Sequence, residues 1–355
     1  MRNGARATHF GMFLEQMSQG HTQADAFRET FQLVDAAEAH GIDGVWLGEL
    51  HFLPNRSVFS SPMVLASSIA TRTRRLRVGT AVQVLPLASP IRIAEEVATV
   101  DHISQGRFEF GVGRSGAVRT YDVLGVPYGE SQSRFREALE ILVEAWKGET
   151  FSYQGQHYQV RNATVSPRPY QQPHPPIRMA ANTPETFEQV GRMGLGIFVG
   201  LRGMNIAELR DRVQTYRKAW RDAGHPGDGS VYLRIPIYAG ATETAALEEP
   251  RATITYYFKR QAEMQRASIG RDGDGPGARR LAQADELASL TFDQILRNRV
   301  AFGTPAQLID RLKGLQEELT LDGIVGEFNP GGMLALDQQI KSLRLFAEAV
   351  VPAFK

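Results

Sequence analysis

The strongest constraint on the fold is a repeating order of segments, in which short apolar runs typical of β-strands alternate with segments of helical periodicity. Eight such runs cover residues 8–13, 45–47, 76–85, 107–112, 177–181, 196–200, 231–239 and 323–328. A strand followed by a helix, repeated without a break in composition, favours a parallel α/β architecture. Eight units in 355 residues predict one (β/α)8 TIM barrel, a single domain over 1–355, rather than two doubly wound domains.

The spacing of apolar residues also predicts which helix faces are buried. Phe27, Phe31 and Val34 recur at intervals of four and three, so we expect them on one face of a helix that ends at Gly41. A later helix repeats the pattern with Phe135, Leu139, Leu142 and Trp146.

Three segments depart from the strand–helix repeat. Alternating aromatic residues predict a surface hairpin over 151–160, and five prolines within 166–176 indicate an extended connector. The segment 251–300 is far longer than a crossover between the seventh and eighth strands needs, and it contains the polar stretch GRDGDGPG at 270–277. Long insertions in compact domains are often lids, so we expect 251–300 to cover the C-terminal face of the barrel.

Composition excludes several classes of function. Forty Lys and Arg residues against 39 Asp and Glu leave a net charge of +1, which gives no basic field to attract nucleic acid or anionic membranes. Without any cysteine, disulfides, thiolate metal sites and cysteine nucleophiles are excluded. The eight histidines lack metal-ligand spacing, and no apolar run is long enough to span a bilayer. We expect a cytoplasmic protein with no metal site and no nucleic-acid or membrane partner.

A glycine-rich turn follows the fourth strand. Gly111, Gly113 and Gly116 match the G-x-G-x-x-G spacing of dinucleotide-binding turns, but the loop runs on through further glycines instead of opening a helix. We interpret it as a loop that lets a ligand approach the backbone. Arg114 lies within it, at the barrel edge, where an arginine meets either solvent or an anionic group such as a phosphate.

Polar residues also follow the fifth and second strands. Asn182 and Thr183 precede a helix that starts with Pro184, so one of them caps it, and the free N–H groups of such a helix start form an anion site. Glu49 and His51 follow the second strand, where a histidine is either structural or an acid, base or hydrogen-bond donor. Active sites of (β/α)8 barrels lie at the carboxyl ends of the strands, so all four side chains are candidates.

Several stretches together resemble the luciferase-like flavin-dependent monooxygenases. The longest are GIDGVWLGELHF at 41–52, LRVGTAVQVLPLASPIRIAEEVATVDHISQGRFEFGVGRS at 76–115 and MAANTPETFEQVGRMGLGI at 179–197. The stretch FGTPAQLIDRL and the C-terminal SLRLFAEAVVPAF extend the resemblance over nearly the whole chain. It implies a (β/α)8 barrel, usually a homodimer, with a flavin at the C-terminal rim and a mobile lid after the seventh strand.

The same resemblance implies the cofactor contacts. It places a non-proline cis peptide, which cups the flavin ring in this family, at Ala81 and Val82. It matches Arg114 to the family's flavin-phosphate arginine. Asn182 and Thr183 fall in the family's other phosphate-contacting turn.

Departures from the family pattern bear on the chemistry. The light-emitting luciferases read Glu-His-His-Phe after the second strand, and their first histidine is a catalytic base; this chain has Leu50 there, between Glu49 and His51. Glu49 remains a candidate cofactor contact, and His51 a candidate catalytic residue without an assigned role. Gly113, a further cofactor-binding candidate, replaces the reactive cysteine, and Ala181 replaces the acidic residue of the phosphate turn, so light emission is not expected.

The resemblance implies a two-component FMN-dependent monooxygenase. A separate NAD(P)H:flavin reductase supplies FMNH2, O2 adds to it, and the flavin C4a-peroxide oxidises a small organic substrate. Two alternatives stay open. Some relatives bind coenzyme F420 and transfer hydride without oxygen, and a non-catalytic flavin-binding protein is conceivable because Leu50 and Gly113 replace reactive residues.

Overall fold

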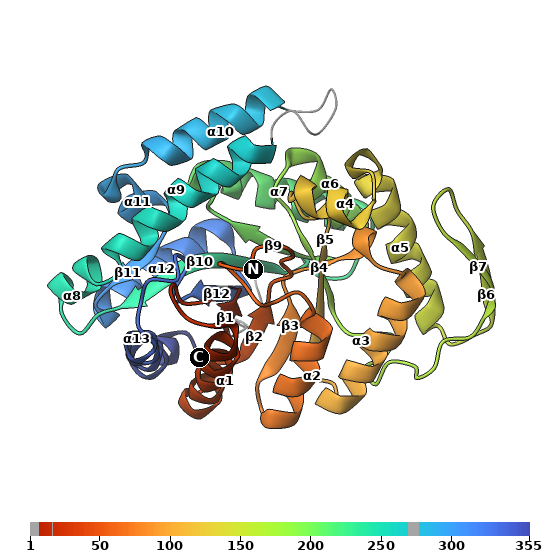
Figure 1. Cartoon of the computed structure of the whole chain (residues 1–355), viewed down its shortest axis with the longest axis horizontal. Coiled ribbons are helices and arrows are strands. Elements are labelled where there is room, and N and C mark those ends of the chain that lie inside the picture. The colour runs from red at the N-terminus through yellow and green to blue at the C-terminus, as the bar shows by residue number, and fades with distance from the viewer. Residues whose placement is uncertain (1–6, 16, 269–276) are drawn as a thin grey trace.

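The chain forms a closed barrel of parallel strands surrounded by helices (Figure 1). The computed structural model describes residues 7–15, 17–268 and 277–355. Each barrel strand pairs with its neighbours in chain order, and the last strand pairs with the first, which closes the ring. The strands are β1 (His9–Leu14), β2 (Gly44–Leu47), β3 (Arg77–Thr80), β5 (Phe108–Gly113), β8 (Ile177–Ala180), β9 (Gly196–Gly200), β10 (Val231–Ala239) and β12 (Gly323–Glu327). The predicted (β/α)8 barrel is confirmed, and every barrel strand overlaps a predicted run.

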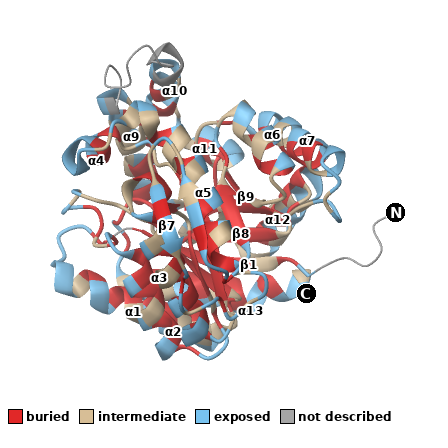
Figure 2. Ribbon diagram, turned by 90° about the vertical axis from the view of Figure 1, so that its right-hand side faces the viewer, coloured by how far each residue is buried: buried red, intermediate tan, exposed pale blue. Residues whose placement is uncertain are grey.

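Helices cover the outside of the barrel, and Figure 2 shows the buried strands inside this layer. In chain order they are α1 (Gln23–His40), α2 (Pro62–Arg72), α3 (Pro90–Ser104), α5 (Ser131–Trp146), α6 (Pro184–Arg192), α7 (Ile206–Asp222), α12 (Pro305–Leu319) and α13 (Leu336–Ala349). Helices α2, α3, α6 and α12 begin with proline, whose missing N–H group would have no helical acceptor at that position. Helix α1 ends at Gly41, whose φ of 86° is a left-handed conformation that suits glycine.

The predicted helix is present as α1, and only part of the face that Phe27, Phe31 and Val34 share is buried. Phe27 is 41% exposed, whereas Ala26, Leu33, Val34 and Ala37 are buried against the strands. Successive residues of a helix are rotated by about 100°, so position 27 lies at the edge of the face that positions 26, 33 and 37 share. The prediction for α5 is confirmed, because its four apolar residues are all buried.

The other irregular segments contain more regular structure than the sequence indicates. The predicted hairpin is present as β6 (Phe151–Gln154) and β7 (Gln159–Ala163). The predicted run 76–85 is divided into β3 and the short strand β4 (Gln83–Val84), and the loop after β5 contains an additional helix, α4 (Val118–Leu124).

The insertion after β10 is largely helical. It contains α9 (Arg251–Ser268), α10 (Gly277–Ser289) and α11 (Phe292–Asn298), preceded by α8 (Glu243–Glu248) and followed by β11 (Ala301–Gly303), which pairs with β10. Helices α9 and α10 pack side by side at one end of the barrel (Figure 1). Of the polar stretch GRDGDGPG, residues 270–276 lie outside the described residues.

The amino-terminal end of the barrel carries a buried charged cluster. Glu109 accepts hydrogen bonds from Arg77 Nε at 2.6 Å and from Arg178 Nε at 2.9 Å, which joins three neighbouring strands. The Arg178 guanidinium carbon lies 3.6 Å from the centre of the Tyr232 ring, and the His9 ring stacks on the same tyrosine. Active sites of this fold lie at the opposite end, so this cluster contributes to stability.

Candidate active site

The residues predicted for the site lie at the carboxyl ends of the barrel strands. Glu49 and His51 follow β2, Ala81 and Val82 follow β3, and Arg114 follows β5. Because these strands are neighbours in the barrel, their following residues share one side of its opening.

The Glu49 carboxylate joins the end of β2 to the turn after β3. It is 5% exposed, and one of its oxygens accepts hydrogen bonds from Gln83 Nε2 and the Val84 N–H group, both at 2.7 Å. Its other oxygen lies 2.8 Å from His51 Nε2. A buried carboxylate with several donors holds its partners in place, so Glu49 positions both His51 and the turn. His51 Nδ1 has no hydrogen-bond partner in the described part of the chain, so it is available to a ligand.

The turn after β3 packs closely against the end of β5. The Ala81–Val82 peptide bond is cis, as the family resemblance predicts. A Cβ atom at Gly113 would lie 2.5 Å from Val82 Cγ2, and one at Gly111 would lie 1.8 Å from the Thr80 carbonyl oxygen. Contact between neighbouring strands therefore requires glycine at both positions.

Arg114 carries a half-buried guanidinium that has no acidic partner among residues 7–15, 17–268 and 277–355. Its Nη1 atom lies 3.3 Å from Ser131 Oγ at the start of α5, and its carbonyl oxygen accepts a hydrogen bond from the Tyr121 hydroxyl. An arginine that is held in place without a carboxylate keeps its charge available for an external anion.

The start of α6, which follows the strand next to β5, is a second candidate anion contact. Thr183 is the N-cap residue, but its side chain makes no capping hydrogen bond, and its Oγ1 lies 2.9 Å from Thr186 Oγ1. The first N–H groups of α6 are therefore not used by this side chain. Since β8 pairs directly with β5, this helix start and Arg114 leave the barrel side by side, with Asn182 exposed in the same turn.

Sequence reasoning missed a second charged group, on the β1, β10 and β12 side of the opening. Arg234 donates to both oxygens of Glu327 at 2.7 and 2.8 Å and lies 3.3 Å from Glu15, which also accepts a hydrogen bond from Arg56. Burial alone would raise the pKa of the Glu15 carboxyl, but Arg56, Arg234 and Arg202 lower it to about 2. The sequence contains a signal for this group, because Glu327 ends the strand β12 and Glu15 directly follows the strand β1.

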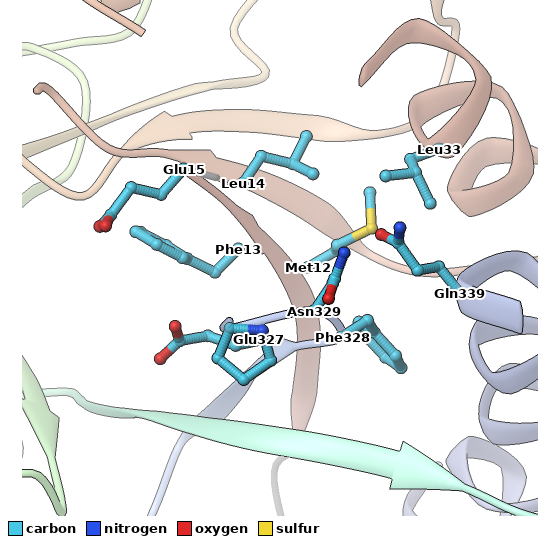
Figure 3. Close-up of a pocket in the computed structure, with 10 residues that line it drawn as sticks. Met12, Phe13, Leu14, Glu15, Leu33, Glu327, Phe328, Asn329 and Gln339 are labelled. Atoms are coloured by element: carbon cyan, nitrogen blue, oxygen red, sulfur yellow. The ribbon is translucent and has the colours of Figure 1, made fainter. Parts of the chain in front are cut away.

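A pocket adjoins this second group (Figure 3). Phe13 lies between Glu15 and Glu327 in it, and the Arg234 guanidinium carbon lies 3.4 Å from the centre of the Phe13 ring. Apolar side chains such as Leu33 line the other end. The pocket is lined by residues of β1, α1, β12, α13 and the segment after β12, away from Arg114.

Helix α9 of the insertion lies against the same side of the opening. Met264 Sδ accepts a hydrogen bond from Arg56 Nη1 at 2.7 Å, and Thr253 Oγ1 lies 3.3 Å from Asn329 Oδ1. The Tyr257 hydroxyl is buried there, and burial raises its pKa. These contacts place α9 at the carboxyl ends of the strands.

The described residues contain neither a metal-ligand cluster nor a membrane-spanning helix. No three of their His, Asp or Glu side chains gather as the ligands of a metal ion would. No described helix combines the length and the apolar character needed to cross a bilayer.

Comparison with known proteins identifies the family. The sequence profile of the luciferase-like monooxygenases matches residues 8–322. The oxygenase component of flavin-dependent trigonelline monooxygenase from Acinetobacter baylyi is 26% identical over 97% of this chain and 95% of its own length. Protein y4wF of Sinorhizobium fredii, uncharacterized, is 36% identical, but the match spans 53% of this chain and 55% of that protein. The chain belongs to the luciferase-like monooxygenase family, which confirms the predicted oxidoreductase class.

Solved structures share the fold but differ in cofactor. The oxygenating constituent of 3,6-diketocamphane monooxygenase from Pseudomonas putida, in complex with FMN, has a TM-score of 0.83 at 18% identity and covers 98% of this chain and 99% of that chain. Coenzyme F420-dependent tetrahydromethanopterin reductase from Methanopyrus kandleri has a TM-score of 0.73 at 19% identity over 98% and 100%. The fold by itself therefore does not select the cofactor.

The residues at the β2–β8 side of the opening fit a phosphorylated flavin. Arg114 and the start of α6 supply positive charge and N–H donors for a phosphate. Gln83 Oε1 is buried without a donor from the described residues, although its Nε2 is held by Glu49. An N–H group at the edge of a bound ring would satisfy that oxygen.

Proposed function

We propose that this protein is an FMN-dependent monooxygenase that works with a separate NAD(P)H:flavin reductase and oxidises a small organic substrate with O2. The observation that carries the proposal is the Arg114 guanidinium, without an acidic partner in the described chain, beside the α6 start that Thr183 leaves without a side-chain cap. Both features favour a phosphate, which FMN carries and riboflavin lacks. The family, and the oxygenase component among its relatives, support a two-component system.

The remaining candidate residues act on the ring side of the cofactor in this proposal. Ala81, Val82 and Gly113 form the packed turn against which the ring lies. Glu49 acts by fixing that turn and by orienting His51, whose Nδ1 is left to hydrogen-bond the flavin or the substrate. Reduced flavin, when bound, supplies the electrons that activate O2.

The insertion over 251–300 excludes water from the site in this proposal. Helix α9 contacts Arg56 through Met264 and Asn329 through Thr253, on two different loops of the opening. Exclusion of water protects a reactive oxidised cofactor state from wasteful decay. A lid of this kind also has to open for the reduced flavin that the reductase supplies.

The substitution Arg114→Ala tests the phosphate role. We expect the Kd for FMN to rise by about 10- to 100-fold, the range for losing a charge-assisted bidentate contact, while the Kd for riboflavin stays nearly constant. Quenching of flavin fluorescence measures both. Arg92→Ala is the matched control, because Arg92 is exposed and faces Glu96 on the outer helix α3. Equal losses for FMN and riboflavin would contradict the proposal.

Reaction with oxygen separates the proposal from F420-dependent hydride transfer. The protein is mixed anaerobically with reduced FMN, O2 is admitted, and the absorbance of oxidised FMN is followed by stopped flow. We expect this absorbance to return more slowly than with free reduced FMN, because the site excludes water. Return at the rate of free FMN, together with tight binding of F420, would overturn the proposal.

A further inference from the structure

Arg202 is an arginine at the barrel opening without a partner among the described residues. It follows β9 by two residues and is partly buried. Its charge helps lower the pKa of Glu15, and it opposes the rise that burial causes in the pKa of Tyr257. Strand β9 pairs with β10, and Gly200 lies opposite Arg234, so the loop that carries Arg202 leaves the barrel next to Arg234. Neither an ion pair nor a hydrogen bond to Arg202 occurs within the described chain.

The carboxylates near Arg202 are already engaged by other arginines. Both oxygens of Glu327 accept hydrogen bonds from Arg234, and Glu15 contacts Arg56 and Arg234. The two carboxylates are thus paired with Arg56 and Arg234, and neither has a hydrogen bond or ion pair with Arg202 in the described chain. The cluster carries one positive charge more than its acidic groups compensate.

Two buried donors beside this cluster also lack an acceptor in the described structure. They are the Tyr257 hydroxyl and Arg56 Nε, on residues that are 2% and 4% exposed. Arg56 Nη1 has only the thioether sulfur of Met264, a weak acceptor. A buried donor without an acceptor is energetically unfavourable, so a ligand that supplies the acceptor would stabilise this arrangement.

A buried arginine of the insertion fixes the loop that carries Arg202. Arg299 is 4% exposed, and its Nη1 donates to the carbonyl oxygens of Leu201 and Met204, at 2.5 and 2.8 Å. These carbonyls flank Arg202 on both sides in sequence. The charge is therefore held on an ordered loop, and a preorganised group loses less entropy on binding a ligand than a mobile one.

We infer that Arg202, Tyr257 and Arg56 form a subsite for an anionic group of the substrate, which makes the substrate a small organic acid bearing a carboxylate or a sulfonate. The inference rests on the proposed function for its place in catalysis. A carboxylate or sulfonate oxygen accepts several hydrogen bonds at once, which matches one uncompensated cation and two unsatisfied donors. The subsite uses Arg56 from the loop after β2, Arg202 from the loop after β9 and Tyr257 of α9, whereas the proposed phosphate contacts are Arg114 after β5 and the start of α6 after β8, so the two groups share no residue.

Binding of three probes of similar size and shape tests the subsite. Isothermal titration calorimetry of the FMN-saturated protein compares benzoate and benzenesulfonate with the neutral benzamide. We expect at least one anion to bind about tenfold more tightly than benzamide, and the tighter anion identifies the head group. Equal affinity for the three probes would overturn the inference.

Variants assign the preference to named residues. We expect Arg202→Gln to remove the preference for the anion, Arg202→Lys to restore part of it, and Tyr257→Phe to reduce it without loss of folding, since only the hydroxyl is removed. Arg221→Gln is the matched control, because Arg221 is exposed on α7 and paired with Asp228. An anion preference that survives in Arg202→Gln would refute the assignment.

The same titrations without FMN separate the two proposals. If FMN does not bind but benzoate or benzenesulfonate still binds in an Arg202-dependent way, the proposed function fails and the subsite stands. If FMN binds with its Arg114 dependence and the three probes bind equally, the proposed function stands and the subsite fails.

Discussion

His9 makes the stability of this protein depend on pH. Its ring stacks on Tyr232 with centroids 5.4 Å apart, and both ring nitrogens are buried without a partner in the described structure. Burial lowers the pKa of His9 to about 4, although Glu109 and Asp43 act in the opposite direction. The residue as a whole is partly exposed, but the nitrogens that bind the proton are buried.

The direction of the effect follows from the two protonation equilibria. In the unfolded chain His9 has a pKa of 6.5, so below that pH its imidazole binds a proton in the unfolded state but not in the folded state. Stability from this group is therefore complete above pH 6.5 and is lost as the pH falls toward 4. With these two pKa values, the free energy of unfolding falls by about 2 kcal/mol between neutral pH and pH 5.

The substitution His9→Phe tests this reasoning, since phenylalanine keeps the stacking on Tyr232 and removes both nitrogens. Urea unfolding, followed by tryptophan fluorescence near pH 7.5 and pH 5, gives the free energy of unfolding at each pH. We expect the wild type to lose about 2 kcal/mol more than the variant over this interval. Equal losses in the wild type and His9→Phe would refute the reasoning.

Two further substitutions test the contacts that shape the opening. Gly111→Ala should cost about 3 kcal/mol or more in thermal unfolding, because the new Cβ would lie 1.8 Å from the Thr80 carbonyl oxygen; Gly314→Ala, with open space around it in α12, should be neutral or slightly stabilising. A small effect at Gly111 would contradict the close packing of β3 and β5. Glu49→Ala should cost about 2 kcal/mol and weaken FMN binding, because Gln83 Nε2 and a backbone N–H lose their acceptor. Unchanged chemical denaturation and flavin titration would show that Glu49 does not position the turn.

Local patterns were sufficient to predict the barrel. The period of apolar residues depends on neighbours within one turn or one strand, and it located every barrel strand before any contact was known. Glu49, His51 and Arg114 were then placed at the carboxyl edge of the barrel, because residues that follow a parallel strand lie at its carboxyl end. The cis peptide at Ala81–Val82, expected from the resemblance, is present.

Packing between elements decided what local patterns could not. Phe27 has the spacing of a core residue but is exposed, because the side of α1 that meets the strands is set by how the whole helix sits on the barrel. The insertion was expected as a lid with a polar stretch, and its helices α9, α10 and α11 were not anticipated. The sequence suggests that Gly113 lets a ligand approach the backbone, whereas in the structure the missing side chain leaves room for Val82.

The sequence by itself determined the order of strands and helices, the end of the barrel that carries the site, and the family. Only the tertiary structure decided which charges are compensated there. Glu15, Arg56, Arg202 and Tyr257 come from four separate segments, and no spacing in the chain indicates that the barrel brings these segments to one end. Whether an arginine is paired or free depends on groups brought from other strands, and the energy of a buried charge depends on all of them together.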